Sequence, residues 1–240
     1  MTDPSRAQND PEVVRREYAD ESGLAGRASL WTRRRGRQPQ DVAFDELTHA
    51  APATVLEVGC GRGEFAARVM RSGIAIVATD LSERMVRLTA DRGVGAEVAD
   101  VERLRFGDGE FDVVVANFML YHVPDLDRGI TELARVLRPG GRLIAATNGR
   151  RQLAELWELV GRDLSDRDEG FTRENGAARL AGHFAEVRRT DLDTTMRLTA
   201  PEIRDYIAHS IRHQHLAAQV PDLSDGLVVT VADGVFVAIR

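Results

Sequence analysis

The chain has 240 residues, with 43% hydrophobic and 29% charged residues, which is typical of one soluble α/β domain with a full core. A formal net charge of −6 argues against a large nucleic-acid-binding surface. No apolar run approaches the length of a membrane span, so we expect neither a nucleic acid nor a membrane as partner.

The cysteine content and the first residues indicate the compartment. Cys60 is the sole cysteine, so no intramolecular disulfide can form, which is typical of a reducing compartment. Residues 1–16 are polar and charged, unlike a secretory signal peptide. We therefore expect a cytoplasmic protein, as a monomer or a homodimer.

The first 50 residues differ in pattern from the other 190, and we expect a helical lid segment over 1–50 ahead of the main domain over 51–240. A helix is expected to begin near Pro11, whose ring suits a first turn. The arginine-rich run over 33–37 is interpreted as a solvated basic edge. A second helix is expected over 41–50.

Apolar runs then alternate with segments of helical spacing. Expected strands cover residues 54–58, 74–79, 94–99, 111–117 and 142–147. Expected helices run from Phe65 to Gly73, from a cap at Ser82 onward, and over 126–137. This alternation predicts a parallel sheet with right-handed crossovers.

The rest of the chain is less regular, and we expect substrate-side helices within residues 149–226. The expected elements are helices over 151–162 and 175–183, a strand over 184–192, a helix over 199–218 opened by a capping box, and a hairpin of 228–231 and 235–239.

Three glycines at alternate positions follow the first expected strand: Gly59, Gly61 and Gly63. Glycine allows positive φ and close approach of a ligand, and the helix N-terminus behind the turn offers free N–H groups. The pattern therefore indicates a nucleotide-type site. The dinucleotide pattern G-x-G-x-x-G is not completed, because Glu64 stands at its third glycine, where a carboxylate would face a diphosphate unfavourably.

The pattern E-x-G-x-G-x-G over 57–63 instead resembles the first motif of class I S-adenosylmethionine-dependent methyltransferases that act on small molecules. The L-R-P-G-G-R-L segment over 137–143 resembles the turn before strand five in that family. The resemblance covers 55–147. It implies S-adenosylmethionine as cofactor, no metal, and a Rossmann-like, doubly wound, seven-stranded α/β sheet. That sheet is mostly parallel with an antiparallel last strand and has helices on both faces.

Acids end three successive strands, where open α/β sheets bind ligands. The resemblance implies that Asp80 accepts hydrogen bonds from both ribose hydroxyls and that Asp100, with the backbone of Val101, holds the adenine amino group. Leu81 and Met85 would flank the adenine ring. The alternatives are that an acid here only forms a turn and that Met85 is core.

The methionine end of the cofactor is assigned in the same way. The resemblance implies that Glu57 orders the turn formed by Gly59 and Gly61, and that Asn117 and Phe118 line the methionine portion. Arg27 would pair with the cofactor carboxylate; the alternative is a surface arginine. His209 and His213 could share a helix face, but no metal motif accompanies them, and a polar face is the favoured interpretation.

Transfer of a methyl group from a sulfonium needs mainly the alignment of nucleophile, carbon and sulfur. His122 follows Tyr121 in the loop expected to face the methyl group, and a neutral imidazole could act as general base. The alternative is that the pair only shapes the pocket. The sequence thus predicts methyl transfer to oxygen or nitrogen of a small-molecule acceptor, whose identity it leaves open. The alternatives are a non-catalytic module that binds S-adenosylmethionine for regulation, and a NAD-dependent oxidoreductase.

Overall fold

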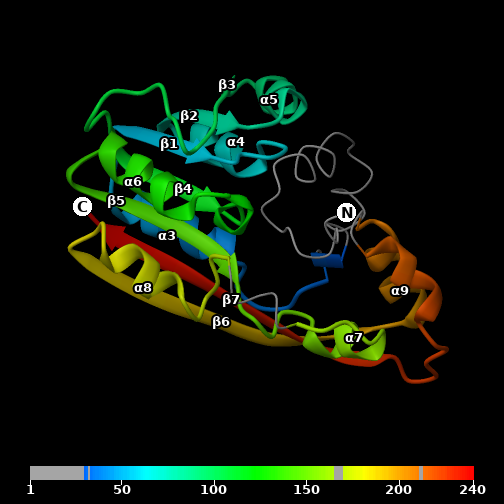
Figure 1. Ribbon diagram of the computed structural model, residues 1–240. Helices are drawn as coiled ribbons and strands as arrows, with labels where there is room; N and C mark the ends of the chain where they lie inside the picture. The colour runs from blue at the N-terminus through cyan, green and yellow to red at the C-terminus, as the bar shows by residue number, and fades with distance from the viewer. Residues whose placement is uncertain (1–29, 32, 165–169, 211–212) are drawn as a thin grey trace.

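A computed structural model describes residues 30–31, 33–164, 170–210 and 213–240 (Figure 1). The helix expected near Pro11 and the predicted ligand Arg27 lie outside these ranges. Within them the chain forms a seven-stranded sheet with the order β3-β2-β1-β4-β5-β7-β6.

Only one strand of this sheet runs against the others. The strands are β1 Thr54–Val58, β2 Ala75–Asp80, β3 Gly95–Val98, β4 Phe111–Asn117, β5 Leu137–Asn148, β6 Glu186–Leu198 and β7 Leu227–Ile239. Strands β1 to β5 pair in parallel, whereas β7 is antiparallel to both β5 and β6. The predicted fold class, including its antiparallel last strand, is confirmed.

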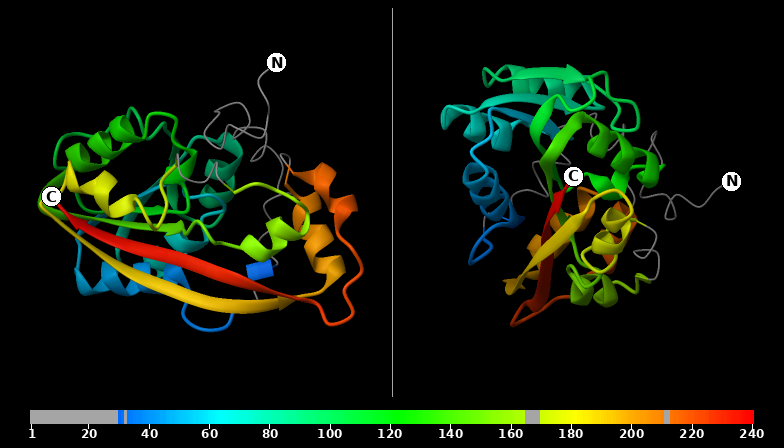
Figure 2. Two further views of the ribbon diagram at one scale, coloured as in Figure 1. Left: turned by 60° about the horizontal axis from the view of Figure 1, so that its bottom comes forward. Right: turned by 90° about the vertical axis from the view of Figure 1, so that its left-hand side faces the viewer.

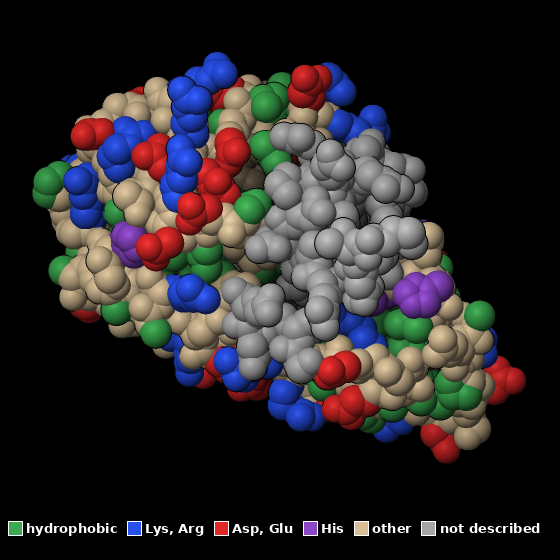
Figure 3. Space-filling view, in the orientation of Figure 1, with side chains coloured by type: hydrophobic (Ala, Val, Ile, Leu, Met, Phe, Trp, Pro, Cys, Tyr) green, Lys and Arg blue, Asp and Glu red, His purple; other side chains and the backbone are tan. Residues whose placement is uncertain are grey.

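Helices cover both faces of this sheet (Figure 2). They are α3 Pro39–His49, α4 Glu64–Arg71, α5 Glu83–Ala90, α6 Leu126–Val136, α7 Ala154–Leu159, α8 Gly176–Ala181 and α9 Ala200–Ala208, with 3-10 turns η1 Leu120–His122 and η3 Gln214–Gln219. None of the helices in the described ranges is long and apolar enough to cross a membrane. On the face shown in Figure 3, arginine and acidic side chains are interspersed over the described surface.

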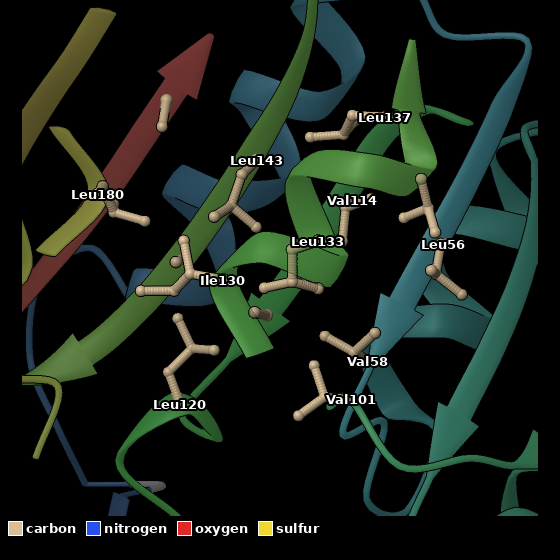
Figure 4. Close-up of a cluster of buried hydrophobic side chains, with 14 of the residues drawn as sticks. Leu56, Val58, Val101, Val114, Leu120, Ile130, Leu133, Leu137, Leu143 and Leu180 are labelled. Atoms are coloured by element: carbon tan, nitrogen blue, oxygen red, sulfur yellow. The ribbon is translucent and has the colours of Figure 1, made fainter. Parts of the chain in front are cut away.

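Alternation along the strands divides the core between the two faces. One face packs Leu56, Val114 and Leu143 against α6, from which Ile130 and Leu133 are fully buried (Figure 4). The opposite face carries the odd-numbered neighbours on β1 and β4 and packs against α3 and α4. Each fully buried side chain of this size contributes about 1.5–3 kcal/mol, so this alternation specifies the strand register strongly.

The predicted C-terminal hairpin is wrong. Residues 227–239 form the single strand β7, with Asp233 paired to Leu192 of β6 and to Asn148 of β5. Gly234 does not turn the chain: a Cβ there would lie 2.7 Å from Cγ of Arg173, so glycine admits the arginine side chain. Partners on both sides keep the strand extended where the local pattern favours a turn.

The expected helix ends also need correction. The capping box at Thr199 is confirmed, with its backbone N–H donating to Glu202 Oε2 at 2.8 Å, but α9 ends at Ala208 instead of continuing to 218. Likewise α7 is shorter than the expected helix over 151–162. Strand β6 extends to Leu198, beyond the expected 184–192.

Residues at and just before the start of α7 form hydrogen bonds with the edge of β7 that β5 does not reach. Beyond the end of β5, the backbone N–H of Leu153 donates to Thr230 O at 2.8 Å. Side-chain oxygens of Glu155 and Gln152 accept from the N–H groups of Thr230 at 2.7 Å and Ala232 at 2.6 Å. The β6–β7 ribbon therefore projects past β5 with its inner edge satisfied, which protects it from pairing with another chain.

A second hydrophobic cluster forms on this projecting ribbon. It joins α7 and α9 to the outer parts of β6 and β7, and it includes Trp157, Met196, Ile203, Ile207 and Val229. The predicted substrate-side segment thus has its own core next to the end of β5.

Arg34 contradicts the interpretation of its arginine-rich run as a solvated edge. Its side chain is 3% exposed and forms an ion pair with Asp233, whose side chain is 2% exposed. A second guanidinium nitrogen donates to the carbonyl of Leu192 at 3.4 Å. Arg37 in the same run does pair at the surface, with Asp45. The run therefore contains one buried anchor between the segment before α3 and the sheet.

We predict that Arg34→Met lowers the free energy of unfolding by roughly 3–5 kcal/mol, because it leaves the Asp233 carboxylate buried and unpaired. The double variant Arg34→Met/Asp233→Leu should recover most of that loss. Urea unfolding measures both variants. Arg37→Met, which breaks the exposed pair, serves as control and should change stability by less than about 1 kcal/mol. A double variant no more stable than Arg34→Met would contradict the assignment.

Candidate active site

The glycine turn has the predicted backbone, with φ of +67° at Gly59, +54° at Gly61 and +73° at Gly63. A Cβ on Gly59 would lie 2.7 Å from Cβ of Met119, and one on Gly63 would lie 2.8 Å from Cα of Thr89. Apart from its chain neighbours, no atom of the described residues lies within 4 Å of the Cβ position at Gly61. Two of the glycines therefore allow close packing, and Gly61 leaves open space above the turn.

The carboxylate of Asp80 holds this turn in place. Its Oδ2 accepts from the backbone N–H of Gly61 at 2.9 Å, and its Oδ1 accepts from the N–H of Ser82 at 2.9 Å. Burial raises the pKa of Asp80, and these two hydrogen bonds oppose the rise. An ionised carboxylate has about four lone-pair sites, so the side chain can still accept from a ligand.

Unsatisfied polar atoms gather beside the turn. Glu57 is 2% exposed, and its burial, with the nearby Asp80 carboxylate, raises its pKa well above the ordinary value. Glu57 Oε2 and both polar atoms of the Asn117 amide are buried and make no hydrogen bond of ordinary geometry with the described residues, although Asn117 lies close enough to Glu57 to lower its pKa slightly against the rise. Buried polar atoms are normally satisfied, so this cluster indicates a place where a polar ligand completes the site.

Cys60 is an inert member of the turn. Its Sγ lies 3.3 Å from Oγ1 of Thr89, and burial raises the pKa of the thiol to about 12. A thiol that stays protonated is a poor nucleophile, so the residue has a packing role.

The other predicted cofactor residues differ in exposure. Asp100 is exposed and accepts from the N–H of Glu102 at 2.9 Å, whereas Val101 and Met85 are buried and Leu81 is partly buried. Phe118 has a φ of +56°, which is uncommon for a residue with a side chain. Such strain is most often found at functional sites. The ligand roles of these residues stay predictions.

The strand register brings the acids together at one edge of the sheet. Glu57 on β1 pairs with Ala78 on β2, so Asp80 lies two residues farther along. Asp80 in turn pairs with Val98 on β3, so Asp100 lies two residues beyond that level. On this side of β1, each successive strand therefore carries its acid two residues farther toward the carboxyl ends of the strands.

The same steps continue on the other side of β1. Glu57 is level with Val115 of β4, and Asn117 lies two residues beyond. Asn117 is level with Ala146 of β5, Asn148 lies two residues beyond, and Asn148 pairs with Asp233 of β7. We call this row the polar arc; it comprises Asp100, Asp80, Glu57, Asn117, Asn148 and Asp233. Sequence analysis missed its last two members, although Asn148 ends an apolar run just as Asn117 does.

The loop after β4 carries Tyr121 and His122, whose ring centroids lie 4.4 Å apart. The backbone N–H of His122 donates to the carbonyl of Met119 at 2.9 Å, and Met119 is the residue that packs over Gly59. His122 is therefore placed beside the glycine turn through one intervening residue. Sequence analysis did not identify Met119, since its role depends on packing across two strands.

Within the described ranges no three His, Cys, Asp or Glu side chains form a group that could hold a metal. The ring of His213 instead packs on Trp157, with centroids 4.9 Å apart.

The strand order, the antiparallel β7 and a glycine turn flanked by acids define the class I, Rossmann-like methyltransferase fold. Residues 56–145 match the family described as "Methyltransferase domain". The YcgJ protein of Bacillus subtilis has a similar structure, with a TM-score of 0.63, 16% identity, and coverage of 82% of this chain and 97% of that one.

Two curated relatives match this chain in sequence. Malonyl-[acyl-carrier protein] O-methyltransferase of Methylococcus capsulatus is 33% identical over 163 residues, 64% of this chain and 56% of that protein. Demethylmenaquinone methyltransferase of Corynebacterium glutamicum is 35% identical over 175 residues, 68% of this chain and 73% of that protein. The chain belongs to the class I S-adenosylmethionine-dependent methyltransferases. It spans about half the length of the first relatives it matches, at 56% and 51%.

We predict that Gly59→Ala mainly lowers stability and that Gly61→Ala mainly lowers cofactor affinity. Both variants bear the strain of a left-handed residue, about 1–2 kcal/mol. Only Gly59→Ala adds a clash, with Met119, so it should be clearly the less stable in urea unfolding. Gly61→Ala should stay folded and lose most affinity for S-adenosylhomocysteine in calorimetry, because its methyl group enters the open space. Unchanged affinity in Gly61→Ala would show that the ligand lies elsewhere.

Proposed function

We propose that this chain is an enzyme that transfers the methyl group of S-adenosylmethionine to an oxygen or nitrogen of a small-molecule acceptor. The observation that carries the proposal is the space that the described residues leave at Gly61, whose N–H donates to Asp80, together with the buried polar atoms of Glu57 and Asn117 on the neighbouring strands. These groups fit a ligand with a ribose at one end and an amino acid at the other.

The residues divide the cofactor between them. Asp80 accepts from the ribose hydroxyls, Asp100 and the backbone of Val101 hold the adenine amino group, and Leu81 and Met85 lie along the adenine ring. Glu57, Asn117 and Phe118 surround the methionine end, where the unsatisfied oxygens of Glu57 and Asn117 suit an ammonium group. Arg27 and the first 29 residues of the expected lid lie outside the described ranges, whereas α3, near the end of that segment, packs against the sheet.

When bound, S-adenosylmethionine supplies a methyl group already activated on a sulfonium. The chain then has to hold the acceptor in line and exclude water. His122 accepts the acceptor's proton where the acceptor is a hydroxyl. Residues 149–226 carry α7, α9 and η3 beyond the end of β5 and form the acceptor side.

The relatives support a small-molecule acceptor but differ in its identity. One is named for O-methylation of a malonyl carrier protein and another for demethylmenaquinone. We propose a cytoplasmic protein, monomeric or homodimeric, without a nucleic-acid partner. The alternative to an enzyme is a non-catalytic module that binds S-adenosylmethionine for regulation.

The first experiment tests the cofactor and the reaction. Calorimetry should show micromolar binding of S-adenosylmethionine and S-adenosylhomocysteine and no binding of NAD, because Glu64 occupies the place of the third dinucleotide glycine. Mass detection of methylated products from a panel of hydroxyl, carboxyl and amine acceptors tests transfer. Tighter binding of NAD would indicate the oxidoreductase. Cofactor binding without any product would favour the regulatory module.

A second prediction concerns His122. His122→Ala should leave cofactor affinity within a few-fold, because the loop reaches the turn through Met119. With a hydroxyl acceptor, turnover should fall by about 10²–10⁴-fold, the contribution of a positioned base. The pH profile of the rate should also lose the ionisation of the base. An unchanged pH profile would leave His122 as a pocket wall, and lost cofactor affinity would place the loop at the methionine end.

A further inference from the structure

The outer half of the polar arc is not used by the proposed cofactor contacts. Asn148 ends β5 and Asp233 lies opposite it on β7, on the sheet face that packs against α3. The neighbouring N–H of Gly149 donates to Ala232 O at 2.6 Å, which makes Asn148 and Asp233 a non-hydrogen-bonded pair. Side chains of such pairs lie close together. The side chain of Asn148 is half-buried, and its amide makes no hydrogen bond with any described residue.

Behind Asn148 lies the buried ion pair of Arg34 and Asp233. Arg34 Nε and Asp233 Oδ1 have no hydrogen-bond partner in the described part of the chain, so the pair retains one donor and one acceptor. Arg173 lies over Gly234 and pairs with both Asp193 and Glu174, whose side chains are more exposed than the Arg34–Asp233 pair. The pair behind Asn148 joins one cation to one anion.

The position of Asn148 and the Arg34–Asp233 pair favours contact with the acceptor molecule and not with the cofactor. Asn148 lies one strand and one step beyond Asn117, which is assigned to the methionine end. The ends of β4 and β5 point to the same side of the molecule, with α7 following β5 (Figure 1). A molecule that receives the methyl group there would extend from the region of Asn117 toward Asn148.

We infer that Asn148, backed by the Arg34–Asp233 pair, forms an acceptor subsite that selects a neutral hydroxyl group. This inference rests on the proposed methyl transfer and adds the chemistry of the acceptor. A hydroxyl both donates and accepts, which matches the half-buried Asn148 amide, whose NH2 donates and whose oxygen accepts. A carboxylate or an ammonium would meet an unfavourable charge in one member of the pair and would lose its hydration without compensation.

The test uses the full chain saturated with S-adenosylhomocysteine and three probes with one ring and different charge: benzyl alcohol, benzylamine and benzoate at neutral pH. Saturation-transfer NMR titrations measure their apparent dissociation constants. Benzyl alcohol should bind best. Asn148→Leu should weaken it by about tenfold, the cost of a lost hydrogen bond. Asn148→Asp should reverse the preference in favour of benzylamine, because it adds a carboxylate to the subsite.

The matched control is Thr195→Asp, which adds the same charge at an exposed residue on the other face of the β6–β7 ribbon and should leave the order of the probes unchanged. Asn148→Ser provides a smaller change should the leucine variant not fold. Three results would overturn the subsite and leave the proposed function standing. They are tighter binding of benzoate or benzylamine than of benzyl alcohol, binding of none of the three probes, and dissociation constants that do not change in the Asn148 variants. Failure to bind S-adenosylhomocysteine would instead overturn the proposed function.

Discussion

Parallel pairing with a constant stagger is the constraint on which the site depends. Both neighbours of β1 carry a polar side chain two residues beyond the level of Glu57, and β3 and β5 repeat the step, so five side chains follow from the stagger. Asp233 of antiparallel β7 completes the arc directly opposite Asn148. A slip of one residue in β4 would turn Asn117 to the opposite face and bury its amide among apolar side chains. The apolar residues that alternate with the arc prevent this slip, so the core and the site specify the same register.

Close packing at the glycine turn also positions the loop that follows β4. Gly59 and Gly63 lie against Met119 and Thr89, and Gly61 is tied to Asp80. Met119 then connects the turn to His122. At the other end of the arc, the Arg34–Asp233 pair holds the segment before α3 against β7. A buried ion pair contributes little net stability compared with apolar side chains of similar size, but removing only one partner is costly. The Arg34–Asp233 pair is therefore suited to holding the segment before α3 in a single position on the sheet.

The region that we propose binds the cofactor and the region that we propose selects the acceptor are separate along the chain. Residues 56–145 match the family, whereas α7, α9 and the projecting β6–β7 ribbon lie outside that match. The two curated relatives described above carry names that differ in the acceptor. A fold shared by proteins with different activities does not by itself fix the acceptor, so we assign that choice to the side chains beyond β5.

Local pattern by itself determined the strand–helix alternation, the glycine turn and the acids at the ends of β2 and β3, because periodicity and turn chemistry depend on near neighbours. Tertiary structure alone decided that Asp233-Gly234 continues a strand and that Arg34 is buried. Arg34 and Asp233 are 199 residues apart, and Asp233 is paired by strands on both sides. Such choices depend on partners that the local sequence does not contain, because a residue's burial and the pairing of a strand are set by what the rest of the chain packs against it.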